Sequence, residues 1–84
     1  MPLIPKGWKE CDSTAVEAFH YDRPRGVLQI LFVEGRVVYD YPCDDHLYVE
    51  FLAAESKGRF VNQVLKPHAE ELGWRPRPRP WRGS

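Results

Sequence analysis

The sequence has few cysteines and no long apolar run, and each absence excludes a class of protein. Two cysteines, Cys11 and Cys43, stand among 84 residues, which is too few for a disulfide-built scaffold, and we expect both to be free thiols. No apolar run approaches the ~20 residues that a membrane-spanning helix needs. The opening MPLIPKGW lacks a long apolar core and a small-residue cleavage site, so we expect no secretory signal. The resulting expectation is a cytoplasmic protein that has no membrane partner.

Metal-binding and catalytic groupings are also sparse. Cys43 and His46 have the spacing of half a zinc site, and Cys11, His20 and His68 are the residues that would complete it. Structural zinc sites usually show two close ligand pairs, and this sequence has one, so we expect neither a metal nor a cofactor. Serines, histidines and acids are present, but a catalytic triad is defined by geometry rather than spacing. We therefore expect no catalytic residues and a protein that is not an enzyme.

Net charge is absent as well, but the neutral total hides two oppositely charged parts. Residues 1–74 carry eight basic and twelve acidic side chains, a net charge of −4, and residues 75–82 carry four arginines, a net charge of +4. The body and the C-terminal segment are therefore different electrostatic objects. With 43% hydrophobic and 29% charged residues, the composition is that of one small folded domain.

Three segments have the composition and alternation of β-strands, residues 13–22, 27–33 and 36–41. Gly35 can take the left-handed conformation that a tight turn between the last two segments needs. Strands joined by such short turns predict an antiparallel meander. Alternation predicts these shared faces: Val16, Ala18 and His20 opposite Glu17, Phe19 and Tyr21; Leu28, Ile30 and Phe32 together; and Val37, Tyr39 and Tyr41 opposite Val38 and Asp40.

After Pro42 the apolar period changes to that of a helix. Residues 45–55 predict an amphipathic helix with Asp44 or Asp45 as its N-cap. A second short helix follows a turn, and Pro67 is expected to end it or kink it. The meander must cover one face, and the helices are the elements available. The predicted fold is α+β, a three-stranded meander followed by two helices on one face (βββαα). It comprises an irregular lead-in (1–12), whose Trp8 we expect to fold back over the core, the domain (13–72) and an extended tail (73–84).

Several of these segments resemble the KTSC family, a small domain at the C-terminus of some lysyl-tRNA synthetases that also stands alone in bacterial proteins. The matching text is YD at 21–22, LQILFVEG at 28–35, YDY at 39–41 as the family's YxY motif, and AAESKGRFVN at 53–62. PCDD after the third strand and Phe60-Val61 before Asn62 depart from the family's usual valine-proline step and aromatic pair. The resemblance implies no established activity, although RNA binding has been suggested for the family because of its attachment to a synthetase.

The tyrosines of the YxY motif are the first candidate binding residues. Tyr39 and Tyr41 lie on one face of a strand, roughly 7 Å apart. Exposed neighbouring rings on a sheet can stack nucleic-acid bases. Alternatively, the two rings pack under the helices with their hydroxyls at the rim of the core, which the shared face with Val37 favours.

The turn between the helices is the second candidate. Ser56, Gly58 and Asn62 can form a small polar pocket with backbone N–H groups and an amide. Alternatively, Ser56 and Gly58 shape the turn while Asn62 ties down a loop by hydrogen bonds. Arg59 is expected to be an exposed contact for phosphate or carboxylate.

The C-terminal segment WRPRPRPWR, residues 74–82, is the third candidate. Proline at every second position is expected to exclude helix and sheet and to favour an extended polyproline conformation, reaching about 25 Å over eight residues. Its expected contact residues are Arg75, Arg77, Arg79, Trp81 and Arg82. The alternative is a tail whose Trp74 docks on the body and whose arginines lie against the acidic surface.

Together these features predict a small binding module, a monomer or weak homodimer. RNA or another acidic partner would contact the tail and exposed aromatic rings. The alternative function is a protein-interaction module that has no nucleic-acid role and uses a sheet edge or the Arg-Pro tail.

Overall fold

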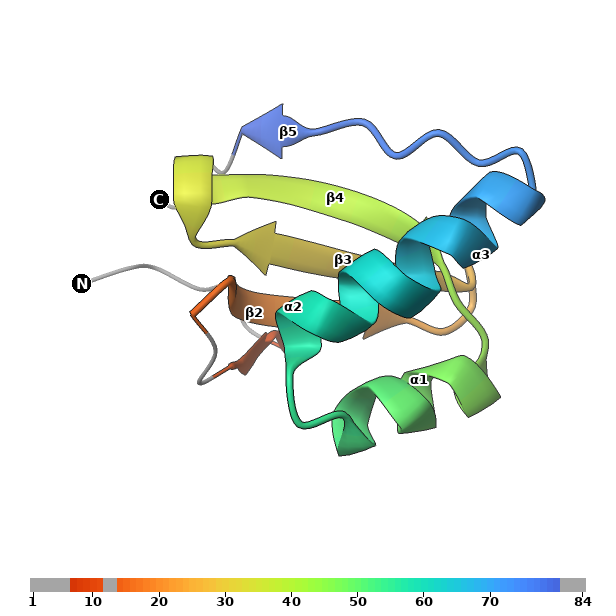
Figure 1. The fold of residues 1–84 in the computed structure, drawn as a ribbon, viewed down its shortest axis with the longest axis horizontal. Coiled ribbons are helices and arrows are strands. Elements are labelled where there is room, and N and C mark those ends of the chain that lie inside the picture. Colours follow the sequence, from red (N-terminus) through yellow and green to blue (C-terminus); the bar gives the residue numbers. More distant parts are fainter. Residues whose placement is uncertain (1–6, 12–13, 81–84) are drawn as a thin grey trace.

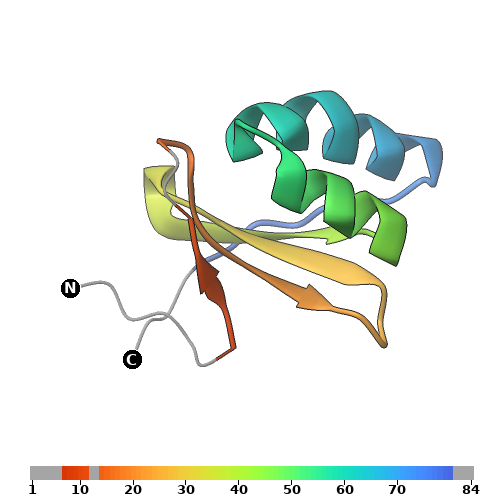
Figure 2. The same cartoon turned by 90° about the horizontal axis from the view of Figure 1, so that it is seen from below.

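The computed structural model describes residues 7–11 and 14–80, and the strands in this part of the chain form one antiparallel sheet in chain order. Helices cover one of its faces, so the predicted α+β class is confirmed (Figures 1 and 2). The predicted three-stranded meander is its centre, and one short strand extends it at each edge. The strands are β1 (Lys9–Glu10), β2 (Val16–Asp22), β3 (Val27–Phe32), β4 (Val37–Pro42) and β5 (Arg79–Pro80).

The turn between β3 and β4 is the 3₁₀ segment η1 (Glu34–Arg36). Gly35 has a φ of 75°, as predicted, and Arg36 follows with a φ of 46°, which is uncommon for a residue with a side chain. The Arg36 guanidinium donates from Nη1 to both carboxylate oxygens of Glu17, at 2.9 and 2.7 Å. This ion pair links the turn to β2 and supports the left-handed backbone at Arg36.

Strand β2 contains a bulge at Glu17, which the sequence pattern did not predict. Val16 lies opposite Phe32, but the next paired residue, Ala18, lies opposite Leu31. An extra residue in one strand reverses the alternation beyond it. Val16 and Phe19 therefore enter the same core cluster, whereas Ala18 enters the cluster on the other face. The predicted face Val16–Ala18–His20 is wrong for this reason, whereas Leu28 and Ile30 share the helix-covered face as expected.

Helix α1 (Asp45–Ala53) begins where Asp44 caps it, because Asp44 Oδ1 accepts a hydrogen bond of 2.8 Å from the Leu47 N–H. A second helical run then spans residues 57–71. It comprises α2 (Lys57–Phe60), the π-helical turn η2 (Val61–Leu65) and α3 (Lys66–Glu71).

Pro67 does not end this run. Its missing N–H leaves a carbonyl one turn earlier without the usual partner. The wider π-helical turn lies directly before it, and the Lys66 N–H donates to the Val61 carbonyl five residues back. The π-helical turn therefore accommodates the proline, and the helix continues to Glu71.

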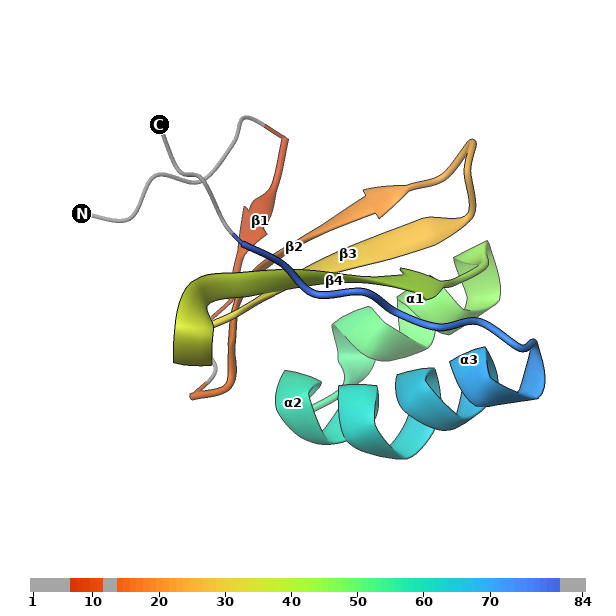
Figure 3. The same cartoon turned by 90° about the horizontal axis from the view of Figure 1, so that it is seen from above.

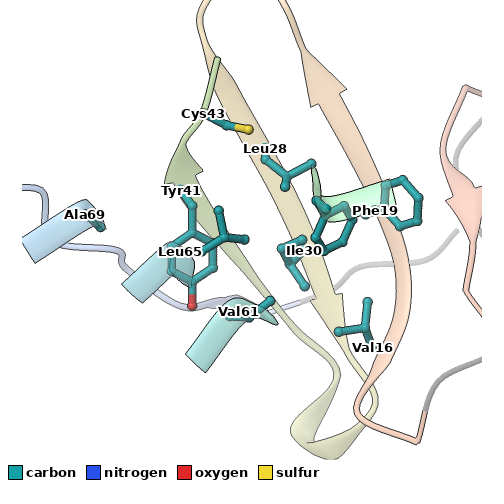
Figure 4. Packing of buried hydrophobic residues seen from close by; sticks show 10 residues of the cluster. Val16, Phe19, Leu28, Ile30, Tyr41, Cys43, Val61, Leu65 and Ala69 are labelled. Atoms are coloured by element: carbon teal, nitrogen blue, oxygen red, sulfur yellow. The ribbon is translucent and has the colours of Figure 1, made fainter. Parts of the chain in front are cut away.

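The main core lies between the helices and the sheet (Figure 4). Its largest buried side chains come from three strands and both helical runs: Val16, Leu28, Ile30, Tyr41, Phe51, Val61 and Leu65. The opposite face of the sheet carries a smaller cluster of Ala18, Leu31 and Val38, against which Trp8 packs. Trp8 thus folds back as expected, onto the face that the helices leave uncovered.

Candidate functional site

The predicted pair Tyr39 and Tyr41 lies under the helices. Their rings stack at a centroid distance of 6.2 Å with 22° between the planes. Tyr41 is 1% exposed, and Tyr39 is half-buried against the same cluster. Burial, followed by the neighbouring Tyr39, raises the pKa of Tyr41 to about 12. Tyr41 is therefore a core residue, and its ring is not available to stack on a base.

A different pair of tyrosines stacks near the surface. Tyr21 at the end of β2 and Tyr48 in α1 have ring centroids 4.4 Å apart and planes 25° apart. The Tyr21 hydroxyl donates to Asp45 Oδ1 at 2.8 Å. Desolvation, followed by this hydrogen bond, raises the pKa of Tyr21 to about 12. The bulge at Glu17 explains the pairing, because it turns Tyr21 to the face on which α1 lies.

Basic side chains flank this pair around an open hollow of about 270 Å³, here called the aromatic hollow. Its lining includes Lys9, Phe19, His20, Tyr21, Arg23 and Tyr48. Arg23 is 72% exposed and contacts Asp45 Oδ1 through Nε at 3.1 Å. Lys9 is exposed and has no ion pair with any residue that the structure describes. Aromatic rings beside cations are the usual composition of a surface for single-stranded nucleic acid.

The aromatic hollow did not follow from the sequence pattern. Alternation grouped Tyr21 with Phe19, as the structure does, but placed both opposite Val16, whereas all three face the main core. The available signal was the helical position of Tyr48, three residues after Asp45, which places both side chains on one side of the first helical turn. Nothing in strand alternation indicates the bulge that brings Tyr21 to them.

In the turn between the helices, Ser56 and Gly58 have structural roles. Ser56 caps α2, and its Oγ accepts a hydrogen bond of 3.3 Å from the Arg59 N–H. Gly58 lies in the first helical turn rather than in a loop, so its predicted role as a turn residue is corrected. A Cβ at Gly58 would lie 2.8 Å from Ala15 Cβ. Glycine is thus needed because helix and sheet approach closely here.

A second hollow, of about 480 Å³, lies beside the same turn. Its lining includes Thr14, Phe32, Ser56, Arg59, Asn62 and Gln63. Arg59 and Asn62 are exposed, and the Asn62 amide makes no hydrogen bond to another described residue. The predicted role of Asn62, to hold a loop by hydrogen bonds, is therefore not observed among the described residues. The hollow is open, and no buried polar side chain of the described residues points into it.

The C-terminal segment is docked rather than free. A positive φ of 69° at Gly73 ends the helical run, with Gly73 N–H bonded to Glu70 O at 3.0 Å and Trp74 N–H to Ala69 O at 2.8 Å. Residues 74–80, here called the Arg-Pro ribbon, then run back beside β4 (Figures 1 and 3). The Trp74 indole N–H donates to the Asp40 carbonyl at 2.9 Å.

Two of the four tail arginines remain available in this part of the chain. Arg79 Nη2 contacts Asp40 Oδ1 at 2.6 Å, while Arg75 and Arg77 are exposed and form no ion pair with the described residues. Arg79 and Pro80 pair with Val38 and Val37. The expectation that alternating prolines exclude sheet structure is wrong at this place. Trp81 and Arg82 lie outside the described residues.

Cys43 and His46, the predicted half of a zinc site, do not assemble with further ligands in the described part of the chain. Groups of three or more potential metal ligands are absent from this part of the chain. Cys43 is buried, and its pKa is raised to about 12 by desolvation and the neighbouring Asp44 and Asp45. His46 is 86% exposed and lies 3.6 Å from Glu50 Oε1. No helix within the described ranges has the length and apolar character to cross a membrane.

Comparisons with known proteins identify the family of this chain. The family model for the KTSC domain matches residues 12–68. A protein from Tsukamurella paurometabola is 39% identical over 56 residues, which make up 67% of this chain and 84% of that protein. A crystal structure of a KTSC domain protein from Yersinia pestis matches with a TM-score of 0.68 and 25% identity, over 89% of this chain and 96% of that one. The chain belongs to the KTSC domain family, which confirms the resemblance found in the sequence.

Proposed function

We propose that this chain is a small non-enzymatic binding module that contacts single-stranded RNA at the aromatic hollow. The observation that carries the proposal is the stacked pair Tyr21–Tyr48 with Lys9 and Arg23 beside it. A base stacks on aromatic rings without regard to its sequence, and the neighbouring cations neutralise the phosphates that follow it. At about 270 Å³ the hollow suits a fragment the size of one nucleotide base rather than a whole cofactor.

Arginines of the Arg-Pro ribbon add to the electrostatic part of this proposal. Arg75 and Arg77 are exposed on a segment that Trp74 and Arg79 fasten to β4. A segment whose backbone is already fastened loses less conformational entropy on binding than a free tail would. The body carries a net charge of −4, so no broad basic face assists them. We therefore expect modest affinity that depends on salt, with a log–log slope of about −3 for four phosphate contacts, those of Lys9, Arg23, Arg75 and Arg77.

Fluorescence anisotropy of a labelled single-stranded RNA tests the proposal at several salt concentrations. We expect Tyr48→Leu to weaken binding about 5- to 150-fold, because base stacking on one aromatic ring contributes roughly 1–3 kcal/mol. Tyr21→Phe is the matched variant, because it keeps the ring and removes only the hydroxyl bonded to Asp45. Binding that is insensitive to both salt and Tyr48→Leu would contradict the proposal.

A second candidate function is a protein-interaction module, and a specific observation favours it. Val49 and Leu52 of α1 are 63% and 40% exposed, on a body whose net charge is negative. Neighbouring exposed apolar side chains, such as these at i and i+3 of one helix, form the kind of patch at which protein partners bind. A pull-down after nuclease treatment that recovers one specific protein, and loses it in Val49→Asp, would favour this function. Recovery of RNA alone from untreated extract would favour the first.

A further inference from the structure

The alternation of arginine and proline has a consequence for the edge of the sheet. Along an extended strand, successive backbone N–H groups point to opposite edges. The Asp40 carbonyl faces the ribbon, and so do the backbone groups of Val38 two residues away, so the hydrogen-bonded pair between β5 and β4 is Arg79 with Val38. Pro80, and Pro78 two residues before it, therefore face away from β4. The outer edge of the ribbon has no N–H to donate at these positions.

Asp40 fastens the ribbon at two points. Its backbone carbonyl accepts from the Trp74 indole N–H at 2.9 Å, and its carboxylate binds Arg79 at 2.6 Å. Asp40 and Val38 lie two residues apart on β4, so their backbone groups point to the same edge. On this edge of β4, Val38 pairs with Arg79, and the Asp40 carbonyl accepts a hydrogen bond from the Trp74 indole. The ribbon therefore occupies the edge at both residues.

We infer that the Arg-Pro ribbon is a built-in edge cover that prevents β4 from pairing with β4 of a second copy of this chain. An uncovered strand edge is a template for pairing with another chain. The sequence VVY at 37–39 is β-branched and aromatic, the composition that favours such pairing. Two copies of one antiparallel edge pair with each other about a twofold axis. The ribbon replaces that partner with a strand whose own outer edge lacks donors.

Sedimentation velocity over a range of concentrations tests this inference. We expect the full chain to sediment as a monomer, and a variant that ends at Gly73 to show a doubling of its sedimenting mass. Arg75→Ala/Arg77→Ala is the matched control, because these side chains make no ion pair with the described residues, and we expect it to remain a monomer. A stable dimer of the full chain, or a folded monomer of the shortened chain, would overturn the inference.

A full-length variant covers the case in which the shortened chain fails to fold. Trp74→Ala/Arg79→Ala removes both contacts that fasten the ribbon to Asp40, so it uncovers β4 in a chain of full length. We expect this variant to self-associate as its concentration rises, and a monomer at all concentrations would overturn the inference. RNA binding is a separate readout: Arg75→Ala/Arg77→Ala should weaken RNA binding without self-association, and Trp74→Ala/Arg79→Ala should self-associate while it retains RNA binding.

Discussion

Two pairs of stacked tyrosines lie in this small domain, and they differ in what covers them. Tyr39 and Tyr41 come from neighbouring positions of one central strand, and the second helical run closes over them. Tyr21 and Tyr48 come from a strand end and a helix, and their rings stack more closely, at 4.4 Å against 6.2 Å. Stacking therefore does not separate a core pair from a surface pair. Full burial of one ring does: Tyr41 is 1% exposed, whereas Tyr21, Tyr39 and Tyr48 are half-buried against the main core.

The comparison also separates two roles of the tyrosine hydroxyl. The Tyr21 hydroxyl is held by a carboxylate at 2.8 Å, on a side chain that borders the open aromatic hollow. Tyr41 is buried, and burial is the main reason that its pKa is raised. The same residue type thus contributes ring packing at one place and a polar tie between β2 and α1 at the other.

Removing one ring from each pair should give the largest contrast. We expect Tyr41→Ala to lower the free energy of unfolding by about 3–5 kcal/mol, because it empties a fully buried site. Tyr48→Ala should cost about 1 kcal/mol, close to the value of one stacked aromatic contact. Urea denaturation followed by circular dichroism measures both, and Tyr41→Phe is the control that keeps the ring. Equal losses for the two alanine variants would break the comparison.

The sequence predicts most of the frame that carries these pairs. Gly35, the Asp44 cap and the shared face of Leu28 and Ile30 follow from local rules and agree with the structure. The bulge at Glu17 did not follow, because strand alternation does not mark it, and the ion pair that accompanies it joins Glu17 to Arg36, nineteen residues away in sequence. That one extra residue puts Val16 on the same face as Phe19 and Tyr21, where alternation predicts opposite faces, so the pattern did not show that Tyr21 faces the helices.

The prediction that the tail contains no sheet structure was wrong for a related reason. Proline propensity correctly excludes a central strand, but an edge strand needs donors on one side only. Whether Arg79 finds Val38 depends on Asp40, Trp74 and the direction in which Gly73 sends the chain. These are contacts between distant parts of the sequence, and no local pattern contains them. The proposed binding surfaces also combine residues that are distant in the sequence, so no local pattern predicts them.

Gly58 tests how closely the helices cover the core pair. Alanine in a helix is favoured over glycine by up to about 1 kcal/mol. Here its Cβ would lie 2.8 Å from Ala15 Cβ, and overpacking costs about 1–3 kcal/mol. We expect Gly58→Ala to lower the free energy of unfolding by about 2 kcal/mol at most, measured in urea. Adding Ala15→Gly should recover part of that loss, and a Gly58→Ala variant more stable than the natural chain would show a looser contact.

Cys43 lies in the same covered cluster as Tyr41, and it tests through pH whether that side of the sheet excludes water. Desolvation raises the pKa of its thiol from 9.0 to about 12. Below pH 9 the thiol is protonated in the folded and the unfolded chain, so the stabilisation is fully present. Above pH 9 the unfolded chain loses the proton first, and the stabilisation is lost progressively as the pH rises toward 12.

At pH 10 the loss attributable to Cys43 is about 1.4 kcal/mol, one unit above the pKa of the unfolded thiol. The measurement is the difference in the free energy of unfolding between pH 7 and pH 10, in reducing buffer, for the natural chain and for Cys43→Ala. The variant loses some packing at both pH values, but its decrease between them should be smaller by about that 1.4 kcal/mol. Tyr21 and Tyr41 titrate in both chains, so their contributions cancel in the comparison. Equal decreases in the two chains would mean that water reaches Cys43 in the folded state, and that the covered tyrosine pair is less protected than its packing indicates.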